Sequence, residues 1–437
     1  IKLPARFMNP IQRHSALPAS RALLLVLLVG TGSLLTGQAA DAPISEGKPT
    51  ATVQQPEPVV APNLDLKEVA PVHQPATALE VFEEPPVKPA PMPVDTPLHG
   101  DDTDTEKFII LGAEVAPGTA TRLAWSSDGS ISGLATPTPV LVIRGKHPGQ
   151  TLCLTAAVHG DELNGIEIVR RVMYDIKPED LSGNIIGIPI VNLQGFQRGS
   201  RYLSDRRDLN RFFPGEANGS LASRIAHSLF SEVITHCDKL IDMHTGSLRR
   251  TNMPQIRADM RNKEVATFTE GFGKIAVIHS AGSPGMLRAA ALEHDITAAT
   301  LEVGESLRIQ EDQIEMGVSS INRVLEREGM YSRLFTWGEP EPIYYQSSWI
   351  RAERGGILFS KKELGEMVDT DEVLGTITDP ITNESSSILA TTSGRIIGMA
   401  VDQFVMPGYG CYHIGIEASE EVLAEQEPPL MPAVDVE

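Results

Sequence analysis

The stretch TAAVHGDELNG, residues 155–165, carries polar residues at the point where an apolar run ends. Residues 151–158 read TLCLTAAV, which has the length and composition of a fully buried β-strand. His159, Asp161 and Glu162 follow this run immediately. In sheets built from buried parallel strands, ligand sites collect at the carboxyl ends of the strands. The sequence therefore predicts a functional site at the end of this strand.

Strands alternate with helices through the middle of the chain. Apolar runs predict strands at residues 151–158, 184–192, 239–244, 274–280 and 298–304. Helices are predicted at 163–175 and 220–236, and shorter strands precede the set at 106–115, 121–127 and 139–145. Continuous apolar strands between helices are typical of a sheet covered on both faces. We therefore expect an α/β fold with a mixed, mainly parallel sheet flanked by helices.

Length and composition divide the chain into segments. The 437 residues, 41% of them apolar, suffice for one large core and a smaller second one. Residues 41–104 are rich in Pro, Ala, Val and Glu, and they cannot bury enough apolar area to offset the loss of chain entropy. We predict a leader at 1–40, a disordered linker at 41–104, an α/β domain at 105–340, a β-rich domain at 341–418 and a disordered acidic tail at 419–437.

The leader has the pattern of an export signal. Arg13 and Arg21 precede the apolar run Ala22–Leu35, which is about as long as a signal-peptide core and short for a spanning helix. Small residues near Ala39 then suit a cleavage site. We expect export to the periplasm with cleavage near Ala39 or Ala40. An uncleaved inner-membrane anchor is the alternative.

Charge and cysteine content exclude several classes of protein. The formal net charge of −20 disfavours nucleic acid and anionic lipid as partners. The three cysteines, Cys153, Cys237 and Cys411, are scattered and indicate neither a structural zinc cluster nor a disulfide framework. Cys153 lies inside an apolar strand, so we expect it to be a small core residue.

Three residues have the chemistry of a metal site. His159 and Glu162 are three positions apart at one strand end, and His244 ends a second apolar strand, KLIDMH. Two imidazoles and one carboxylate suit a tetrahedral zinc ion with an open fourth position, where a water becomes acidic enough to act as a nucleophile. Two simpler interpretations stay open at this point. Asp161 or Glu162 could complement a helix N-terminus, and His244 could be a structural histidine.

Further residues could complete a hydrolytic site. Glu302 emerges from the strand AATLEVG, where a carboxylate could relay a proton, although it could equally pair with a lysine. Asn210 and the adjacent Arg211 suit the two-pronged capture of a carboxylate. Arg201, upstream in the same segment, could polarise a carbonyl as its oxygen becomes negative. As a charge cluster alone, this segment would more often be a solvated loop.

Taken together, the motifs HGDE, RYLSDRRDLNR with FPG, DMHTG and LEVGE resemble the succinylglutamate desuccinylase and aspartoacylase family, which has a zinc carboxypeptidase-like fold. The resemblance covers roughly residues 106–412. It implies one zinc ion per chain, held by His159, Glu162 and His244. It also implies that Glu302 is the general base, that Asn210 and Arg211 bind a substrate carboxylate and that Arg201 assists the carbonyl. Two extra residues separate Arg201 from the DLNR motif, which leaves Arg206 or Arg207 as alternatives.

The C-terminal part differs in kind. Residues 350–417 read as two similar halves of short strands with Gly turns, a pattern that resembles the barrel-sandwich fold of biotinyl and lipoyl domains. Carriers of that fold present a lysine at a hairpin tip, and the corresponding turn here, TDPITNESS, has none. We therefore expect an all-β lid that shapes or shields the zinc site.

Three functions remain open from the sequence. The leading one is a zinc amidohydrolase that removes an acyl group from an N-acyl amino acid or a similar small carboxylate-bearing amide. The alternative is a periplasmic zinc carboxypeptidase or peptide amidase acting on cell-wall peptides, and the third is a binding protein that has lost catalysis. The expected partner is thus a small N-acyl amino acid or a peptide-like substrate, and the sequence leaves a homo-oligomer open. Ser283, Gly285 and Arg288 either line the pocket or form an ordinary loop before a helix.

Overall fold

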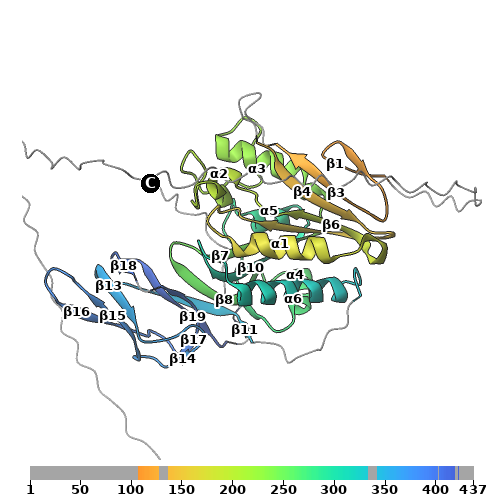
Figure 1. Cartoon of the computed structure of the whole chain (residues 1–437). Helices are drawn as coiled ribbons and strands as arrows, with labels where there is room; N and C mark the ends of the chain where they lie inside the picture. The colour runs from red at the N-terminus through yellow and green to blue at the C-terminus, as the bar shows by residue number, and fades with distance from the viewer. Residues whose placement is uncertain (1–106, 127–135, 333–341, 402, 419–421, 423–437) are drawn as a thin grey trace, which may run out of the picture. The chain divides into compact units, whose positions relative to one another are not determined.

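The computed structural model describes residues 107–126, 136–332, 342–401, 403–418 and 422 (Figure 1). The predicted leader, the proline-rich linker and nearly all of the acidic tail lie outside these residues. The chain divides into two compact units at 98/99, and everything described belongs to the second. In the described part, no helix combines the length and apolar character that crossing a membrane requires.

Four parallel strands form the centre of the main sheet. In spatial order they are β6 (Ser182–Ile188), β5 (His147–Ala156), β7 (Lys239–Gly246) and β10 (Thr297–Glu305). On one side β4 (Thr138–Arg144) and β3 (Thr119–Trp125) add antiparallel. On the other, β8 (Arg250–Ala258) runs antiparallel to β10 and parallel to β9 (Ala276–His279). The predicted mixed sheet is confirmed, and its longest parallel run lies at its centre.

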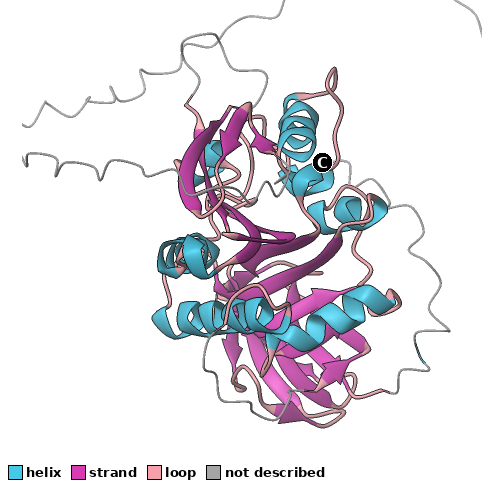
Figure 2. Cartoon of the chain, turned by 90° about the vertical axis from the view of Figure 1, so that its right-hand side faces the viewer, coloured by secondary structure: helices cyan, strands magenta, loops and turns pink. Residues whose placement is uncertain are grey.

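Helices cover both faces of this sheet (Figure 2). One face packs under α1 (Asn164–Asp175), α4 (Lys263–Thr269) and α6 (Glu311–Arg327), and the other under α3 (Leu221–Glu232) and α5 (Leu287–Glu293). Successive residues of β5 alternate between the two cores: Leu152 and Leu154 enter the first, and Cys153 enters the second. This alternation explains why the central strands read as continuous apolar runs.

Shorter elements complete this part of the chain. They are the hairpin β1 (Phe108–Ile110) and β2 (Ala113–Val115), the single-turn helix α2 (Leu193–Phe196) and 3₁₀ turns at Pro178–Asp180, Leu209–Arg211, Ile234–His236 and Glu270–Phe272. The helix predicted at 220–236 is interrupted, because α3 ends at Glu232 and a 3₁₀ turn follows. It begins as expected, since the Ser220 side chain accepts a hydrogen bond from the Ser223 N–H and caps the first turn.

Cys153 is a core residue as expected, but it forms a disulfide bond with Cys237, so the expectation that the scattered cysteines form no disulfide is wrong. Their Cα atoms are 5.7 Å apart, although 84 residues separate them in the chain. The sequence held no signal for the pair, because it depends on β5 lying beside β7: Cys153 is in register with Leu240, and Cys237 lies just ahead of that strand. Cys411 is a free, buried cysteine.

The C-terminal residues form an all-β sandwich that continues the main sheet. β17 (Gly394–Ala400) pairs with β8 of the α/β part, and β19 (Gly410–Ile416), β12 (Gln346–Arg351) and β14 (Met367–Val368) extend it further. The second layer is a sheet of β16 (Ser385–Leu389), β15 (Val373–Thr378), β13 (Gly356–Ser360) and β18 (Phe404–Val405). Apolar residues of both layers form a core of their own. A short strand, β11 (Ile343–Tyr344), pairs with β9.

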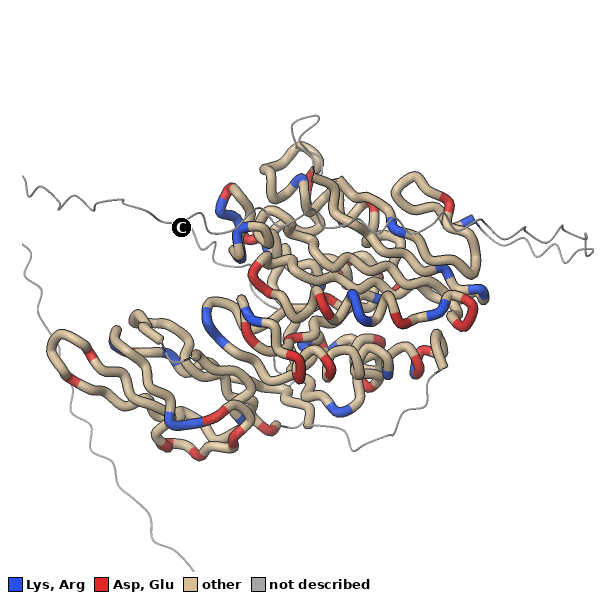
Figure 3. The backbone as a smooth tube through the Cα atoms, viewed as in Figure 1, with Lys and Arg blue, Asp and Glu red and all other residues tan. Residues whose placement is uncertain are grey.

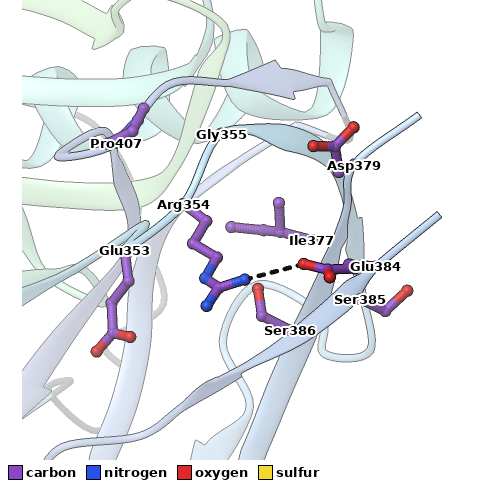
Figure 4. A pocket seen from close by; sticks show the side chains of 9 residues that line it. All are labelled: Glu353, Arg354, Gly355, Ile377, Asp379, Glu384, Ser385, Ser386 and Pro407. Atoms are coloured by element: carbon purple, nitrogen blue, oxygen red, sulfur yellow. Dashed lines mark hydrogen bonds and ion pairs between the residues drawn. The ribbon is translucent and has the colours of Figure 1, made fainter. Parts of the chain in front are cut away.

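A surface pocket of about 290 Å³ lies beside the turn that joins β15 to β16 (Figure 4). An ion pair of 3.3 Å between Arg354 Nη1 and Glu384 Oε2 crosses it. Its lining residues are Glu353, Arg354, Gly355, Ile377, Asp379, Glu384, Ser385, Ser386 and Pro407. The lining includes none of the predicted site residues, so this pocket is separate from the metal-ligand candidates.

The disulfide predicts a simple labelling result. When the oxidised protein is unfolded in denaturant without reductant and alkylated, only Cys411 should react, and prior reduction should add Cys153 and Cys237. The measurement is the mass shift of the tryptic peptides. Three alkylated cysteines without reduction would contradict the pairing.

Candidate metal centre

Three potential metal ligands converge at the carboxyl edge of the parallel strands. His159 Nδ1 lies 2.9 Å from Glu162 Oε1, and His244 Nδ1 lies 2.8 Å from Glu162 Oε2. The two Nδ1 atoms are 3.1 Å apart. All three side chains are buried, and the ligand atoms lie within 4.8 Å of one another. Among the described residues, this is the cluster of His, Cys, Asp and Glu that could hold a metal ion.

The pairing of β5 with β7 produces this convergence. Ala156 is in register with Met243, so His159, which follows β5, and His244, near the end of β7, lie at the same edge of the sheet. A turn closed by the Glu162 N–H to the His159 carbonyl, at 3.2 Å, then brings Glu162 back towards His159. The turn requires glycine at position 160, because an added Cβ would lie 2.1 Å from neighbouring backbone. Helix α1 has no side-chain cap, so the structure does not support the capping interpretation of Asp161 or Glu162.

Each imidazole is held from behind by a carboxylate. Asp208 Oδ1 lies 3.1 Å from His159 Nε2, and Asp242 Oδ2 lies 2.7 Å from His244 Nε2. A carboxylate at Nε2 keeps the proton there and leaves Nδ1 free to bind a metal. Neither Asp208 nor Asp242 is among the site residues predicted from the sequence. Asp242 could have been found, since a residue two positions before His244 on a strand faces the same side.

At this centre, neighbouring charges oppose the effect of burial on the pKa values of Glu162 and His244. Burial alone would raise the pKa of Glu162, but His159 and His244 hold it well below its usual range. Burial alone would lower the pKa of His244, but Asp242 and Glu162 hold it well above its usual value. Two Nδ1 donors and one carboxylate, each with an outer partner, fit a zinc ion.

Arg201 lies against the metal ligands. Its Nη1 is 3.3 Å from Glu162 Oε1, and its Nε and Nη2 donate to Asp208 Oδ2 at 3.2 and 2.7 Å. The alternatives to Arg201 lie elsewhere: Arg207 is half exposed and pairs with Asp205, and no contact of Arg206 with the centre is present among the described residues. Most N–H groups of the Arg201 guanidinium are therefore engaged by Glu162, by Asp208 behind His159 and by Ser247.

Asn210 and Arg211 lie side by side but differ in what they contact. The Asn210 side-chain oxygen accepts a hydrogen bond of 2.8 Å from the Leu287 N–H at the start of α5. Arg211 is 46% exposed, donates to the Asn210 carbonyl and lies 4.0 Å from Asp208 Oδ2. Arg211 is therefore the more available of the two for a ligand, whereas Asn210 also fixes the start of a helix.

Glu302 lies on the strand next to His244. The two residues are in register in neighbouring parallel strands, so both side chains project from the same face of the sheet. Glu302 Oε2 accepts a hydrogen bond of 2.9 Å from Asn252, and Oε1 lies 3.4 Å from Arg257 Nε. Its ionic partner is thus an arginine of β8 rather than the lysine considered from the sequence.

The loop before α5 packs against the segment that carries Arg211. Gly285 accepts a hydrogen bond from the Phe213 N–H, and an added Cβ there would lie 2.2 Å from the Arg211 carbonyl oxygen. Arg288 is buried and donates to Thr300 Oγ1 at 3.1 Å and to the Ser280 carbonyl at 2.7 Å. Burial and the nearby Arg257 lower the pKa of Arg288 to about 10. Ser283 and Gly285 therefore belong to a packed loop, and Arg288 is a buried cation on the face of the sheet that carries Glu302.

Basic and acidic residues are interspersed over the helices and the C-terminal strands (Figure 3). Exposed pairs such as Arg171 with Glu311 join α1 to α6 through two hydrogen bonds of 2.5 and 2.8 Å. The arginines around the metal-ligand cluster are therefore a local feature rather than part of a large basic surface.

Residues 148–327 match the model of the succinylglutamate desuccinylase/aspartoacylase catalytic domain. The N-alpha-acetyl-L-2,4-diaminobutyric acid deacetylase of Halomonas elongata is 33% identical over 126 residues, which are 29% of this chain and 36% of that protein. The succinylglutamate desuccinylase of Pseudomonas fluorescens is 28% identical over 141 residues, which are 29% of this chain and 39% of that one. The chain thus spans little more than a third of the length of either curated relative.

Solved structures share the fold at lower identity. A succinylglutamate desuccinylase/aspartoacylase from Rhodobacter sphaeroides has a TM-score of 0.64 and 21% identity, over 70% of this chain and 99% of that one. The product-bound ectoine utilization protein EutE of Ruegeria pomeroyi has a TM-score of 0.62 and 22% identity, and the match covers 68% of this chain and 94% of that one. The fold is therefore that of the desuccinylase and aspartoacylase proteins. Residues 148–327 are thus similar to the catalytic domain of the succinylglutamate desuccinylase/aspartoacylase family.

The carboxylates behind the imidazoles yield a test of the metal centre. Asp242→Asn should weaken zinc binding by about 10- to 100-fold, because the amide can no longer hold the Nε2 proton as a charged acceptor. Competition with a chromophoric chelator measures the affinity. The control is Asp259→Asn, which removes a partly exposed carboxylate that pairs with Arg261 instead. Equal zinc affinities in the two variants would contradict the role of Asp242.

Proposed function

We propose that this protein is a zinc-dependent amidohydrolase that cleaves the amide bond of an N-acyl amino acid or a related small carboxylate-bearing amide. One observation carries the proposal: two imidazole Nδ1 atoms and one carboxylate meet at a buried point, and each imidazole is fixed by a further carboxylate. The relatives support the reaction class, because one is named a deacetylase and the other a desuccinylase.

The ligands would be His159, Glu162 and His244. Zinc held by such a set supplies Lewis-acid chemistry, which makes a water acidic and polarises a carbonyl oxygen. Arg201 balances the charge of Glu162 and Asp208 and holds both in place. One N–H of its Nη2 remains for a carbonyl oxygen that becomes negative, since a guanidinium carries five N–H groups.

Glu302 is the proposed general base. It takes a proton from the attacking water and later gives it to the amine that leaves. Asn252 and Arg257, both on β8, contact its two carboxylate oxygens and restrict its orientation. That neighbouring strand, β7, carries His244 in register with Glu302.

Arg211 is the proposed anchor for a substrate carboxylate. Its guanidinium is half exposed and lacks a carboxylate partner closer than 4.0 Å in the described part of the chain. Asn210 Nδ2 can add a second donor, while its Oδ1 stays with the Leu287 N–H. The C-terminal β domain is proposed to act as a lid that restricts the site to small substrates, because it joins the sheet next to the strand that orients Glu302.

Export to the periplasm is proposed from the leader at residues 1–40. The Cys153–Cys237 disulfide supports it, because structural disulfides form and persist in oxidising compartments and are rare in the bacterial cytosol. A cell-fractionation experiment with a matched reporter fusion tests this proposal independently of activity.

The reaction itself can be tested directly. Zinc-loaded protein is incubated with a panel of N-acyl amino acids and, in parallel, with muropeptides, and the release of primary amine is measured. Release from N-acyl amino acids supports the deacylase. Release from muropeptides alone would replace it with the cell-wall peptidase alternative, and no release from either would refute both.

Glu302→Gln should retain zinc and lose hydrolysis by about 10²- to 10⁴-fold, because an amide cannot accept the proton. Metal content and steady-state rates are measured on the same preparation. Glu305→Gln is a matched control on the same strand, where the carboxylate pairs with Arg308. A Glu302→Gln protein with the activity of the control would remove Glu302 from the mechanism.

Arg211→Lys should raise KM for carboxylate-bearing substrates more than for their amidated analogues, because a point charge cannot make a bidentate contact. The effect is measured as the ratio of kcat/KM for the two substrates. Arg207→Lys, in the same loop and paired with Asp205, is the control. An unchanged ratio would refute the anchor.

A further inference from the structure

The turn between β7 and β8 has an unusual backbone. Leu248 and Arg249 are consecutive non-glycine residues with positive φ, 55° and 60°. Residues other than glycine rarely adopt positive φ, and this backbone conformation persists only where the surrounding structure holds it. We call residues 245–249, which are the last two residues of β7 and the three that connect it to β8, the β7–β8 turn; they follow His244 directly.

The inner side of the turn contacts a proposed metal ligand. Ser247 Oγ donates to Glu162 Oε1 at 2.8 Å and accepts a hydrogen bond of 2.5 Å from Arg201 Nη1. The Thr245 N–H donates to Glu162 Oε2 at 3.1 Å. Both oxygens of the Glu162 carboxylate are thus oriented by residues of this turn.

The outer side of the turn is held by the C-terminal β domain. Tyr409 Oη donates to the Leu248 carbonyl at 2.5 Å and itself accepts a hydrogen bond from Gln403 Nε2 at 2.7 Å. The Arg249 carbonyl accepts from the Val401 N–H at 3.0 Å and from Gln403 Nε2 at 3.3 Å. Both residues with positive φ therefore present their carbonyls to the other domain.

A cation–π contact with Arg250 keeps the ring of Tyr409 in position. The Arg250 guanidinium lies 4.2 Å from the centre of the Tyr409 ring and 5.0 Å from that of Trp349. Trp349 in turn stacks on His413 at 4.5 Å, with the rings nearly parallel. Arg250 also donates to the Gly410 carbonyl at 2.9 Å. The Tyr409 ring thus lies against the Arg250 guanidinium, and removal of the hydroxyl leaves that contact in place.

We propose that Tyr409 is a positioning residue for the metal centre: through the Leu248 carbonyl it holds the strained turn that presents Ser247 to Glu162. The inference rests on the proposed function in so far as Glu162 is a metal ligand. It gives the C-terminal domain a role beyond covering the site, because the domain fixes the geometry of one ligand. The coupling runs from Tyr409 to Leu248, along the turn to Ser247, and from there to Glu162.

The test removes one hydroxyl. Tyr409→Phe keeps the ring over Arg250 and loses the hydrogen bonds to Leu248 and Gln403. Zinc affinity should fall about 3- to 10-fold, the value of roughly one net hydrogen bond. In the metal-free protein, amide hydrogen exchange of residues 245–251 should become faster. The control is Tyr174→Phe, which removes a hydroxyl bonded to Arg122 on an exposed face and should change neither quantity.

A double-mutant cycle tests whether Tyr409 acts on Glu162 through Ser247. Ser247→Ala removes the contact with Glu162 directly, so Tyr409→Phe should add little to the loss of zinc affinity in the Ser247→Ala background. Full additivity would overturn the proposal, because Tyr409 would then act by another path. Unchanged zinc affinity together with unchanged exchange in Tyr409→Phe would overturn it as well.

The outcome is separable from the failure of the proposed function. If the wild-type protein bound no zinc, the proposed function would fall, yet hydrogen exchange of the turn would still report whether Tyr409 holds it. If wild type bound zinc and hydrolysed amides while Tyr409→Phe behaved as wild type in both measurements, only the positioning role would be lost.

Discussion

The parallel pairing of β5 with β7 is the constraint on which the rest of the structure depends. It sets His159 and His244 at one edge of the sheet and places Cys153 beside Cys237 below them. A slip of register by one residue would turn His244 to the opposite face, because side chains alternate along a strand. Side-chain links join the two chain segments in this register: the Cys153–Cys237 disulfide and a hydrogen bond of 2.7 Å from Thr155 Oγ1 to Asp242 Oδ1.

Electrostatics at the strand ends follow from that arrangement. Glu162 is almost completely buried and is surrounded by two imidazoles, a guanidinium and a hydroxyl. Such a buried carboxylate is tolerated because these neighbours compensate its charge. The same neighbours keep its two oxygens pointed at one spot, which is the pre-organisation that a metal site needs.

The sequence was most informative where chemistry and pattern coincide. The ends of apolar runs located His159, His244 and Glu302, since polar residues at such positions are conspicuous. Asp208 and Asp242 needed knowledge of which side chains share a face, and the partners of Glu302 on β8 needed the strand order. The disulfide and the hydrogen bond from Tyr409 to the Leu248 carbonyl depend on contacts between segments far apart in the chain. A single sequence holds no periodic signal for such contacts.

The junction of β17 with β8 has a bearing on protein engineering. Gly398, Met399 and Ala400 pair with residues 250–252 and occupy backbone groups that would otherwise form an open strand edge. Exposed edges recruit strands from other molecules and promote aggregation. Removing part of the C-terminal domain to admit bulkier substrates would therefore expose the edge of β8 and promote aggregation. Substitutions in the loops are a safer way to widen the entrance.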